Sequence, residues 1–156
     1  MVVDLSDLVE HRAVLTGLAC ASRKAVLQLI ATTAADAFGL DAGAVGDGLA
    51  ARERLGSTGF GGGVALPHAR LEGLDTVRAV LIRLDRPVPW AAVDELPVDL
   101  VFALLSPTAA GASHLKALAR VSRAMRDGAF VAKLRGAASA DAMYALLTGD
   151  HARDAA

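Results

Sequence analysis

The alternation of apolar and polar positions first becomes regular in a stretch that predicts a helix over residues 23–38. Ser22 is suited to cap its start, and Gly39 to form the left-handed turn that ends helices. A second helix is predicted from Asp41 to Leu55, although three glycines weaken it. The apolar residues of the first helix recur at intervals typical of one helical face: Val26, Leu27, Ile30, Ala34 and Phe38.

Three apolar runs predict strands. The first lies near residues 13–18, and the second covers residues 77–84, after which Pro87 and Pro89 are expected to break the run. Residues 98–105 carry a single charge near their start. We therefore expect both faces of this third run to be covered, as in a central strand of an α/β sheet.

The C-terminal third returns to helical spacing. Ser113 is placed to cap a helix that runs to Arg126, with His114 in its first turn. A final helix or helix pair covers residues 130–147 and is interrupted near Gly136. Because helices and strands alternate along a chain of 156 residues, we expect one α/β domain over the whole length.

A glycine-rich stretch, residues 52–70, holds five of the 15 glycines. Gly56 is suited to a left-handed turn that ends the preceding helix. A short apolar run then leads to Pro67, which lacks an N–H and fixes its own φ, so a central strand cannot continue through it. His68 is therefore expected where an extended segment stops, beside a loop that can bring backbone N–H groups to a ligand.

The residue types in this stretch can bind and transfer a tetrahedral anion. A neutral imidazole such as that of His68 accepts and releases a group near neutral pH. Glycine N–H groups, the hydroxyls of Ser57 and Thr58 and nearby guanidinium groups could neutralise the anion. The combination suits a phosphohistidine, but composition alone is equally consistent with a glycine-rich turn beside an incidental histidine. The guanidinium groups belong to Arg52, Arg54 and Arg70.

Charge and spacing argue against other kinds of site. A net charge of −1 disfavours general nucleic-acid binding, and the single cysteine excludes an internal disulfide and a cysteine-based metal site. The glycine stretch lacks the Lys-Ser/Thr ending of a P-loop, and Pro67 opposes the helix of a dinucleotide-binding fingerprint. His68 and His114 could share a metal, but no third ligand is evident. We therefore expect no metal and no cofactor.

Apolar runs in the sequence are too short or too interrupted for a membrane span, which needs about 20 mostly apolar residues. The N-terminus carries early acidic residues and no basic region, so a signal peptide is not expected. These features predict a soluble, cytoplasmic protein.

Several sequence blocks resemble the fructose/mannitol/nitrogen-type IIA domain of the bacterial phosphoenolpyruvate phosphotransferase system. They are Arg52 with Glu53, residues 56–59 (GSTG), residues 63–68 (GVALPH), residues 97–105 (PVDLVFALL) and residues 114–119 (HLKALA). The similarity runs over roughly residues 5–148, and the blocks stand in the family's order, so the match is specific. The resemblance implies a mixed β-sheet flanked by α-helices.

The same resemblance implies roles for individual residues. His68 would accept a phosphoryl group, with Nε2 as the favoured nitrogen, from a histidine of a small phosphocarrier protein. His114 matches a second histidine of the family and would orient or hydrogen-bond the phosphoryl group, while Arg52 would stabilise it. A supporting, substrate-binding set is expected at Ser57, Thr58, Gly59 and Arg70.

The chain is most like the standalone nitrogen-type members of this family. The leading hypothesis is therefore a regulatory phosphocarrier, a transferase component whose phosphorylation state is read by partner proteins. One alternative is a sugar-specific fructose or mannitol IIA component that passes the phosphoryl group to a IIB domain. Another is a regulatory binding module that keeps the fold without being phosphorylated. The sequence names neither targets nor a sugar, and it leaves a homodimer open.

Overall fold

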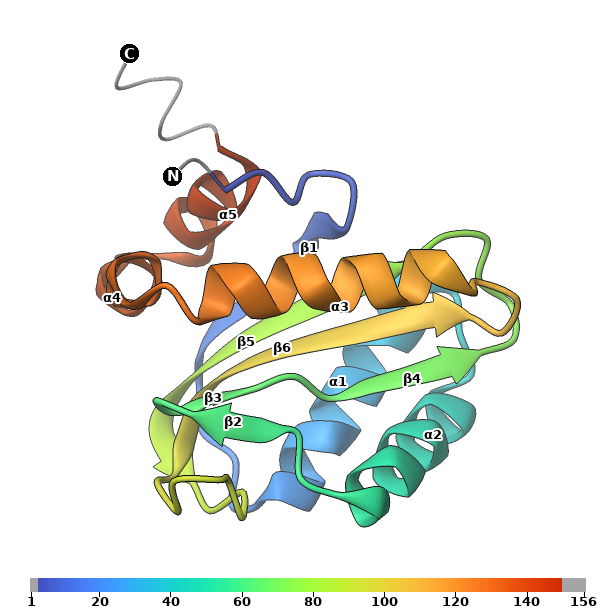
Figure 1. Cartoon of the computed structure of the whole chain (residues 1–156), viewed down its shortest axis with the longest axis horizontal. Coiled ribbons are helices and arrows are strands. Elements are labelled where there is room, and N and C mark those ends of the chain that lie inside the picture. Colours follow the sequence, from blue (N-terminus) through green and yellow to red (C-terminus); the bar gives the residue numbers. More distant parts are fainter. Residues whose placement is uncertain (1–2, 150–156) are drawn as a thin grey trace.

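The computed structural model describes residues 3–149, which form a six-stranded mixed β-sheet with helices on both faces (Figure 1). The strand order is β1-β5-β6-β3-β2, and β4 also pairs with β6. The β1–β5, β3–β6 and β4–β6 pairs are parallel, whereas β5–β6 and β2–β3 are antiparallel. The elements are β1 (Val9–Leu18), α1 (Arg23–Phe38), α2 (Ala42–Leu55), β2 (Gly59–Gly61), β3 (Val64–Ala65), β4 (His68–Leu71), β5 (Arg78–Val88), β6 (Val98–Pro107), α3 (Ala112–Met125), α4 (Gly128–Gly136) and α5 (Ala140–Thr148).

Both faces of the sheet are covered, because successive side chains of β6 point to opposite sides. Leu100, Phe102 and Leu104 belong to the core formed with α3, α4 and α5. Val101 and Leu105 belong to the core formed with α1 and α2. The prediction of a central strand with two buried faces is therefore confirmed for β6, and so is the mixed sheet flanked by helices.

Local capping signals place α1 and α2 as predicted. The hydroxyl of Ser22 accepts a hydrogen bond from the N–H of Ala25 at 3.1 Å, and Gly39 ends α1 in a left-handed conformation with φ 70°. The carboxylate of Asp41 accepts from the N–H of Ala44 at 2.8 Å. These bonds satisfy backbone groups that a helix end leaves free, so both boundaries follow from the nearby sequence.

Two predicted helix signals are wrong. Gly56 follows α2 with φ 158° and ψ 144°, which is not left-handed helical, and its carbonyl accepts a hydrogen bond from Nη1 of Arg52 at 2.8 Å. Helix α3 starts at Ala112, so Ser113 lies inside the first turn and does not cap it. Gly111 takes the N-cap with φ 52° and makes the turn from β6 into the helix without a capping side chain.

The prolines interrupt the strands partly as predicted. No strand runs through Pro67, since β3 ends at Ala65 and β4 begins at His68, and β5 ends before Pro89. Strand β5 continues through Pro87, in a part of the strand beyond Leu84, the last residue that pairs with β1. Strand β4 begins directly after Pro67, whose carbonyl accepts from the N–H of Leu104 at 2.9 Å. Neither missing N–H removes a bond that the sheet needs. His68 therefore starts a strand, contrary to the expectation that an extended segment stops there.

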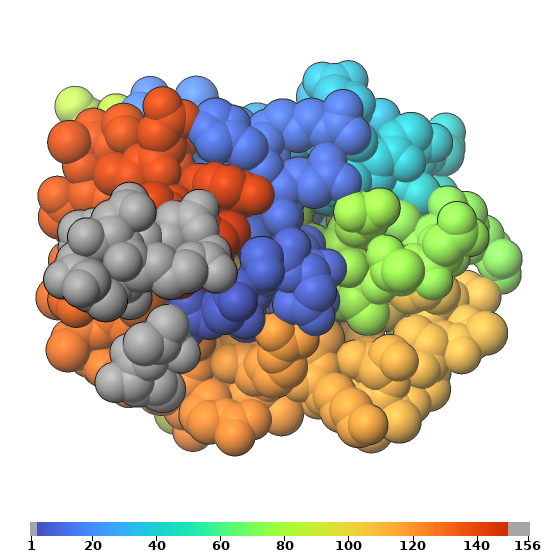
Figure 2. All heavy atoms as spheres, turned by 90° about the horizontal axis from the view of Figure 1, so that it is seen from above, coloured from blue at the N-terminus to red at the C-terminus, as the bar shows by residue number. Residues whose placement is uncertain are grey.

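The N-terminal segment joins parts of the chain that are distant in sequence. The N–H of Leu5 donates to the carbonyl of Leu147 in α5 at 2.7 Å. Arg120 of α3 donates two hydrogen bonds to the carboxylate of Asp7, at 2.7 and 2.8 Å. In Figure 2 the dark-blue N-terminal segment accordingly lies between the red C-terminal helices and the orange helix α3.

Candidate active site

The histidines singled out in the sequence lie together at a hollow of about 480 Å³. His68 is the first residue of β4, His114 lies in the first turn of α3, and Arg52 lies in the last turn of α2. The two imidazole rings are 5.6 Å apart between centres. Three separate elements therefore bring the three predicted catalytic residues to one place.

The hydrogen bonds of His68 determine which ring nitrogen carries the proton. Its Nδ1 lies 2.9 Å from the carbonyl oxygen of Leu66, which can only accept a hydrogen bond. Its Nε2 lies 3.1 Å from Nε of Arg52, which can only donate. Both neighbours thus assign the proton to Nδ1 and a lone pair to Nε2. The ring can therefore act as a nucleophile through Nε2.

The surroundings of His68 also keep it neutral. Burial lowers its pKa below the usual value of 6.5, and the positive charge of Arg52 lowers it further. The carbonyl of Leu66 and the carboxylate of Glu53 oppose this shift but do not reverse it. At neutral pH the imidazole therefore keeps the lone pair that a nucleophile needs.

His114 is held differently from His68. It is buried, and its Nδ1 lies 2.6 Å from the hydroxyl oxygen of Ser106. Its pKa is lowered by burial first, and then by the nearby Arg70 and His68. Two neutral imidazoles therefore face the same hollow, and the charge there comes from the arginines.

The arginines near the site differ in their placement. Arg52 is fixed by its bonds to His68 and to the carbonyl of Gly56. Arg70 stands two residues after His68 on β4, so both side chains lie on the same face of the strand, and both line the hollow. Arg54 is exposed and makes no hydrogen bond or ion pair with residues 3–149. The structure thus brings together Arg52 and Arg70, but not Arg54.

The glycine-rich residues predicted to bind substrate are engaged elsewhere. The hydroxyl of Ser57 donates to the carbonyl of Trp90 at 2.9 Å, and that of Thr58 donates to the carboxylate of Glu53. Gly59 is packed so closely that an added Cβ would lie 3.0 Å from Cδ1 of Trp90. None of the three lines the hollow. Their proposed role in phosphoryl binding stays a prediction.

Two buried polar residues that support the site were not identified as such from the sequence. Glu53 accepts from both the N–H and the hydroxyl of Thr58, and it forms an ion pair with Arg23 at 3.7 Å. Ser106 is fully buried and contacts His114. In hindsight Ser106 carried a signal, because it is the hydroxyl that follows an uninterrupted apolar run in β6.

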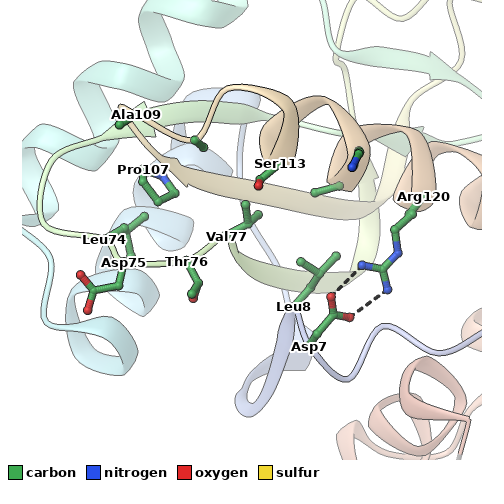
Figure 3. Close-up of a pocket in the computed structure, with 13 residues that line it drawn as sticks. Asp7, Leu8, Leu74, Asp75, Thr76, Val77, Pro107, Ala109, Ser113 and Arg120 are labelled. Atoms are coloured by element: carbon green, nitrogen blue, oxygen red, sulfur yellow. Dashed lines mark hydrogen bonds and ion pairs between the residues drawn. The ribbon is translucent and has the colours of Figure 1, made fainter.

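A larger hollow of about 720 Å³ lies between the N-terminal segment, the loop before β5 and another part of α3 (Figure 3). Arg120, which is hydrogen-bonded to Asp7, stands at one end, and Leu74 and Pro107 stand toward the other. Its walls contain neither histidine nor cysteine. The larger hollow therefore lacks a side chain that could accept a group through an imidazole, whereas the smaller hollow has two.

Within residues 3–149, no group of three or more histidine, cysteine, aspartate or glutamate side chains is arranged to hold a metal ion. Over the same residues, every helix is too short or too polar to cross a membrane.

Known proteins resemble the chain over most of its length. The nitrogen regulatory protein of Bradyrhizobium diazoefficiens is 46% identical over 143 residues, which cover 92% of this chain and 94% of that protein. The fructose-specific EIIA component of the phosphotransferase system of Haloferax volcanii is 30% identical over 106 residues, covering 67% of this chain and 69% of that protein. The solved structure of nitrogen regulatory protein IIA-Ntr from Neisseria meningitidis matches with a TM-score of 0.84 at 31% identity, covering 92% of this chain and 99% of that one.

A family model gives the same result. Residues 7–149 match the model described as phosphoenolpyruvate-dependent sugar phosphotransferase system, EIIA 2. The match contains the last turn of α2, the start of β4 and the start of α3, and so contains all three predicted catalytic residues. The chain therefore belongs to the EIIA 2 family of the phosphoenolpyruvate-dependent sugar phosphotransferase system, with nitrogen regulatory proteins among its relatives.

Proposed function

We propose that this protein is a nitrogen-type regulatory phosphocarrier that accepts a phosphoryl group on Nε2 of His68 from a histidine of a small phosphocarrier protein. The observation that carries the proposal is the arrangement of this ring, with Nδ1 bonded to the carbonyl of Leu66 and Nε2 facing Arg52 in the hollow. The donor and the readers of the phosphorylation state would meet the protein in the cytoplasm.

The transfer exchanges one nitrogen–phosphorus bond for another. Nε2 of His68 forms a bond to phosphorus while the bond to the donor imidazole breaks, and the electron pair of that bond stays on the donor nitrogen. Because the two bonds are alike, the site needs alignment and neutralisation of charge more than a strong base. Arg52, 3.1 Å from Nε2, can turn its N–H groups to the incoming phosphoryl oxygens.

His114 and Arg70 complete the proposed site. Both line the hollow beside His68, so each could contact a phosphoryl group carried there. A neutral His114 can donate a hydrogen bond from Nε2, and Arg70 adds a positive charge. We assign both an auxiliary role in holding the phosphoryl group rather than in accepting it.

Relatives support the nitrogen-type assignment over a sugar-specific one. The nitrogen regulatory protein of Bradyrhizobium diazoefficiens is 46% identical to this chain and matches 92% of it, whereas the fructose-specific component is 30% identical and matches 67%. A sugar-specific role, with transfer onward to a IIB domain, is the second candidate, because the fructose-specific relative still shares 30% identity. A binding module that is never phosphorylated is the third, and the joint placement of His68, His114 and Arg52 speaks against it.

Intact mass spectrometry tests the proposal directly. The wild-type protein and His68→Ala are incubated with phosphoenolpyruvate, enzyme I and the histidine phosphocarrier. We expect an acid-labile gain of one phosphoryl group in the wild type and none in the variant. Transfer from the phosphorylated protein to a IIB domain would favour the sugar-specific role. No gain with a competent donor pair would favour the unphosphorylated binding module.

A further inference from the structure

The burial of Ser106 determines which group donates the hydrogen bond between Ser106 and His114. Ser106 is fully buried on the central strand β6, and its Oγ lies 2.6 Å from Nδ1 of His114. Among residues 3–149 the Ser106 side chain has no other hydrogen-bond partner. The hydroxyl proton can therefore be satisfied only by donation to Nδ1.

The opposite direction would leave a buried group without a partner. If Nδ1 of His114 carried the proton and donated to Ser106, the hydroxyl proton would have no acceptor in an environment that excludes water. If Ser106 donates, both its proton and the Nδ1 lone pair are used. A neutral imidazole has one ring proton, so that proton must then be on Nε2.

The two histidines would thus hold opposite tautomers. His68 carries its proton on Nδ1 and presents a lone pair at Nε2, as its bonds to Leu66 and Arg52 require. His114 would present an N–H at Nε2, the ring nitrogen that has no hydrogen-bond partner in the described part of the chain. An N–H attracts a phosphoryl oxygen, whereas a lone pair at the same atom would repel it.

We propose that Ser106 is a positioning residue that fixes His114 as the Nε2–H tautomer, so that His114 donates a hydrogen bond to the phosphoryl group carried by His68. The part that concerns phosphoryl binding rests on the function proposed above. The tautomer itself is a property of the unphosphorylated protein and can be measured without any transfer. Failure of one part can therefore be distinguished from failure of the other.

The first measurement is long-range ¹H–¹⁵N NMR of the full chain with ¹⁵N-labelled histidine at neutral pH. In the wild type we expect His114 protonated on Nε2 and His68 protonated on Nδ1. Ser106→Ala should move the nitrogen shifts of His114 toward a mixture of tautomers while leaving those of His68 in place. Ser106→Thr, which keeps the hydroxyl, should restore the Nε2–H pattern.

The matched control is Ser113→Ala. Ser113 is an exposed serine in α3, the helix that carries His114, and its side chain makes no hydrogen bond to His114. It should leave all histidine signals unchanged. A wild-type His114 that carries its proton on Nδ1 overturns the proposal, even if Ser106→Ala fails to fold. Unchanged His114 signals in a folded Ser106→Ala variant overturn it as well.

The consequence for phosphoryl transfer is then measured on the phosphorylated protein. We expect Ser106→Ala to accept the group several-fold more slowly than wild type, with Ser106→Thr closer to wild type. Equal rates in all three proteins, with the tautomer changed as expected, would overturn the link to transfer. If wild type accepts no phosphoryl group at all, the proposed function fails, while the tautomer result stands on its own.

Discussion

Nε of Arg52 donates a hydrogen bond to Nε2 of His68 at 3.1 Å, so the guanidinium covers the nitrogen that is expected to react. The same side chain is held at its other end by the carbonyl of Gly56. Acceptance of a phosphoryl group would require the hydrogen bond between Arg52 and His68 to break. The guanidinium N–H groups would then move to the phosphoryl oxygens. Arg52 is therefore bonded to His68 in the free protein, and it would supply positive charge to the phosphoryl group in the proposed phosphorylated form.

Removing this guanidinium should slow phosphoryl acceptance. Hydrogen bonds to charged groups contribute about 1.5–3 kcal/mol, which corresponds to a rate lowered roughly 10- to 150-fold in Arg52→Gln. The initial rate of mass gain at a fixed concentration of phosphorylated donor measures the effect. Arg54→Gln is the control, since Arg54 is exposed and lies outside the hollow. Equal rates in the two variants would contradict the role given to Arg52.

Removing the second imidazole should have a different effect from removing the first. His114→Ala is expected to accept the phosphoryl group in part, because Nε2 of His68 is still present, but to transfer it onward poorly or to be less stable. The buried hydroxyl of Ser106 loses its partner, which costs about 1–3 kcal/mol of unfolding free energy. Mass gain, return of the group to the donor and urea unfolding measure the three effects. Complete loss of acceptance in both histidine variants would refute this division of roles.

The pH dependence follows from the lowered pKa of His68. A lowered pKa means that the ring is protonated only below the usual value of 6.5, so acceptance should stay constant as the pH falls from 8 to that value and decline only below it. The ¹H NMR titration of the His68 ring checks the pKa directly. Half-protonation at or above 6.5 would contradict the prediction.

The stability of the fold should also decrease as the pH falls below 6.5. Below pH 6.5 the unfolded chain binds protons at both histidines that the folded chain does not bind. The free energy of unfolding should therefore fall as the pH drops from 6.5 through the lower, folded pKa values. Urea unfolding at several pH values measures this, and His68→Ala should show a smaller fall than the wild type.

Thr58→Val tests whether the glycine-rich segment stabilises the fold or binds the phosphoryl group. The substitution keeps the shape but removes a buried hydroxyl that donates to Glu53, so we expect a loss of about 1–3 kcal/mol with acceptance retained. Urea unfolding and mass gain are measured together. Thr32→Val is the control, because Thr32 is exposed on α1. A drop in acceptance at unchanged stability would assign the hydroxyl to phosphoryl binding.

Alanine substitutions at Gly62 and Gly63 distinguish the effect of backbone strain from that of a steric clash. Gly62 and Gly63 have φ values of 67° and 78°, so alanine at either position is strained by about 1–2 kcal/mol. An added Cβ at Gly62 meets nothing within 4 Å, whereas at Gly63 it would lie 2.5 Å from Nη2 of Arg135. Gly63→Ala should therefore unfold at a lower urea concentration than Gly62→Ala. Equal midpoints would mean that Arg135 moves aside freely.

The parts of the fold that the sequence predicted correctly depend on short-range interactions. Ser22 and Asp41 cap helices through N–H groups three residues away, which the sequence displays directly. Pro87 was misjudged because its effect depends on neighbours that are remote in sequence. Pro87 is tolerated where β1 no longer pairs with β5, and this depends on strand pairing that local sequence does not reveal.

The same distinction holds for the site. The phosphoryl chemistry expected of His68 rested on a family resemblance, because residue type and nearby glycines alone left an incidental histidine equally open. The meeting of His68 with Arg52 and His114 depends on how α2, β4 and α3 pack. Ser106 and Glu53 derive their roles from burial, since an exposed hydroxyl or carboxylate would be satisfied by water. No local sequence pattern predicts which polar residue will be buried beside which histidine.

The direct start of β4 after Pro67 has a mechanical consequence. The backbone on both sides of His68 is tied to β6, by the bond from Leu104 to the carbonyl of Pro67 and by the pairing of β4. The His68 ring is thus attached to backbone that is fixed in the sheet rather than to a mobile loop. Each docking partner would find the acceptor nitrogen in the same position, and loading and unloading could repeat without any rearrangement of the main chain.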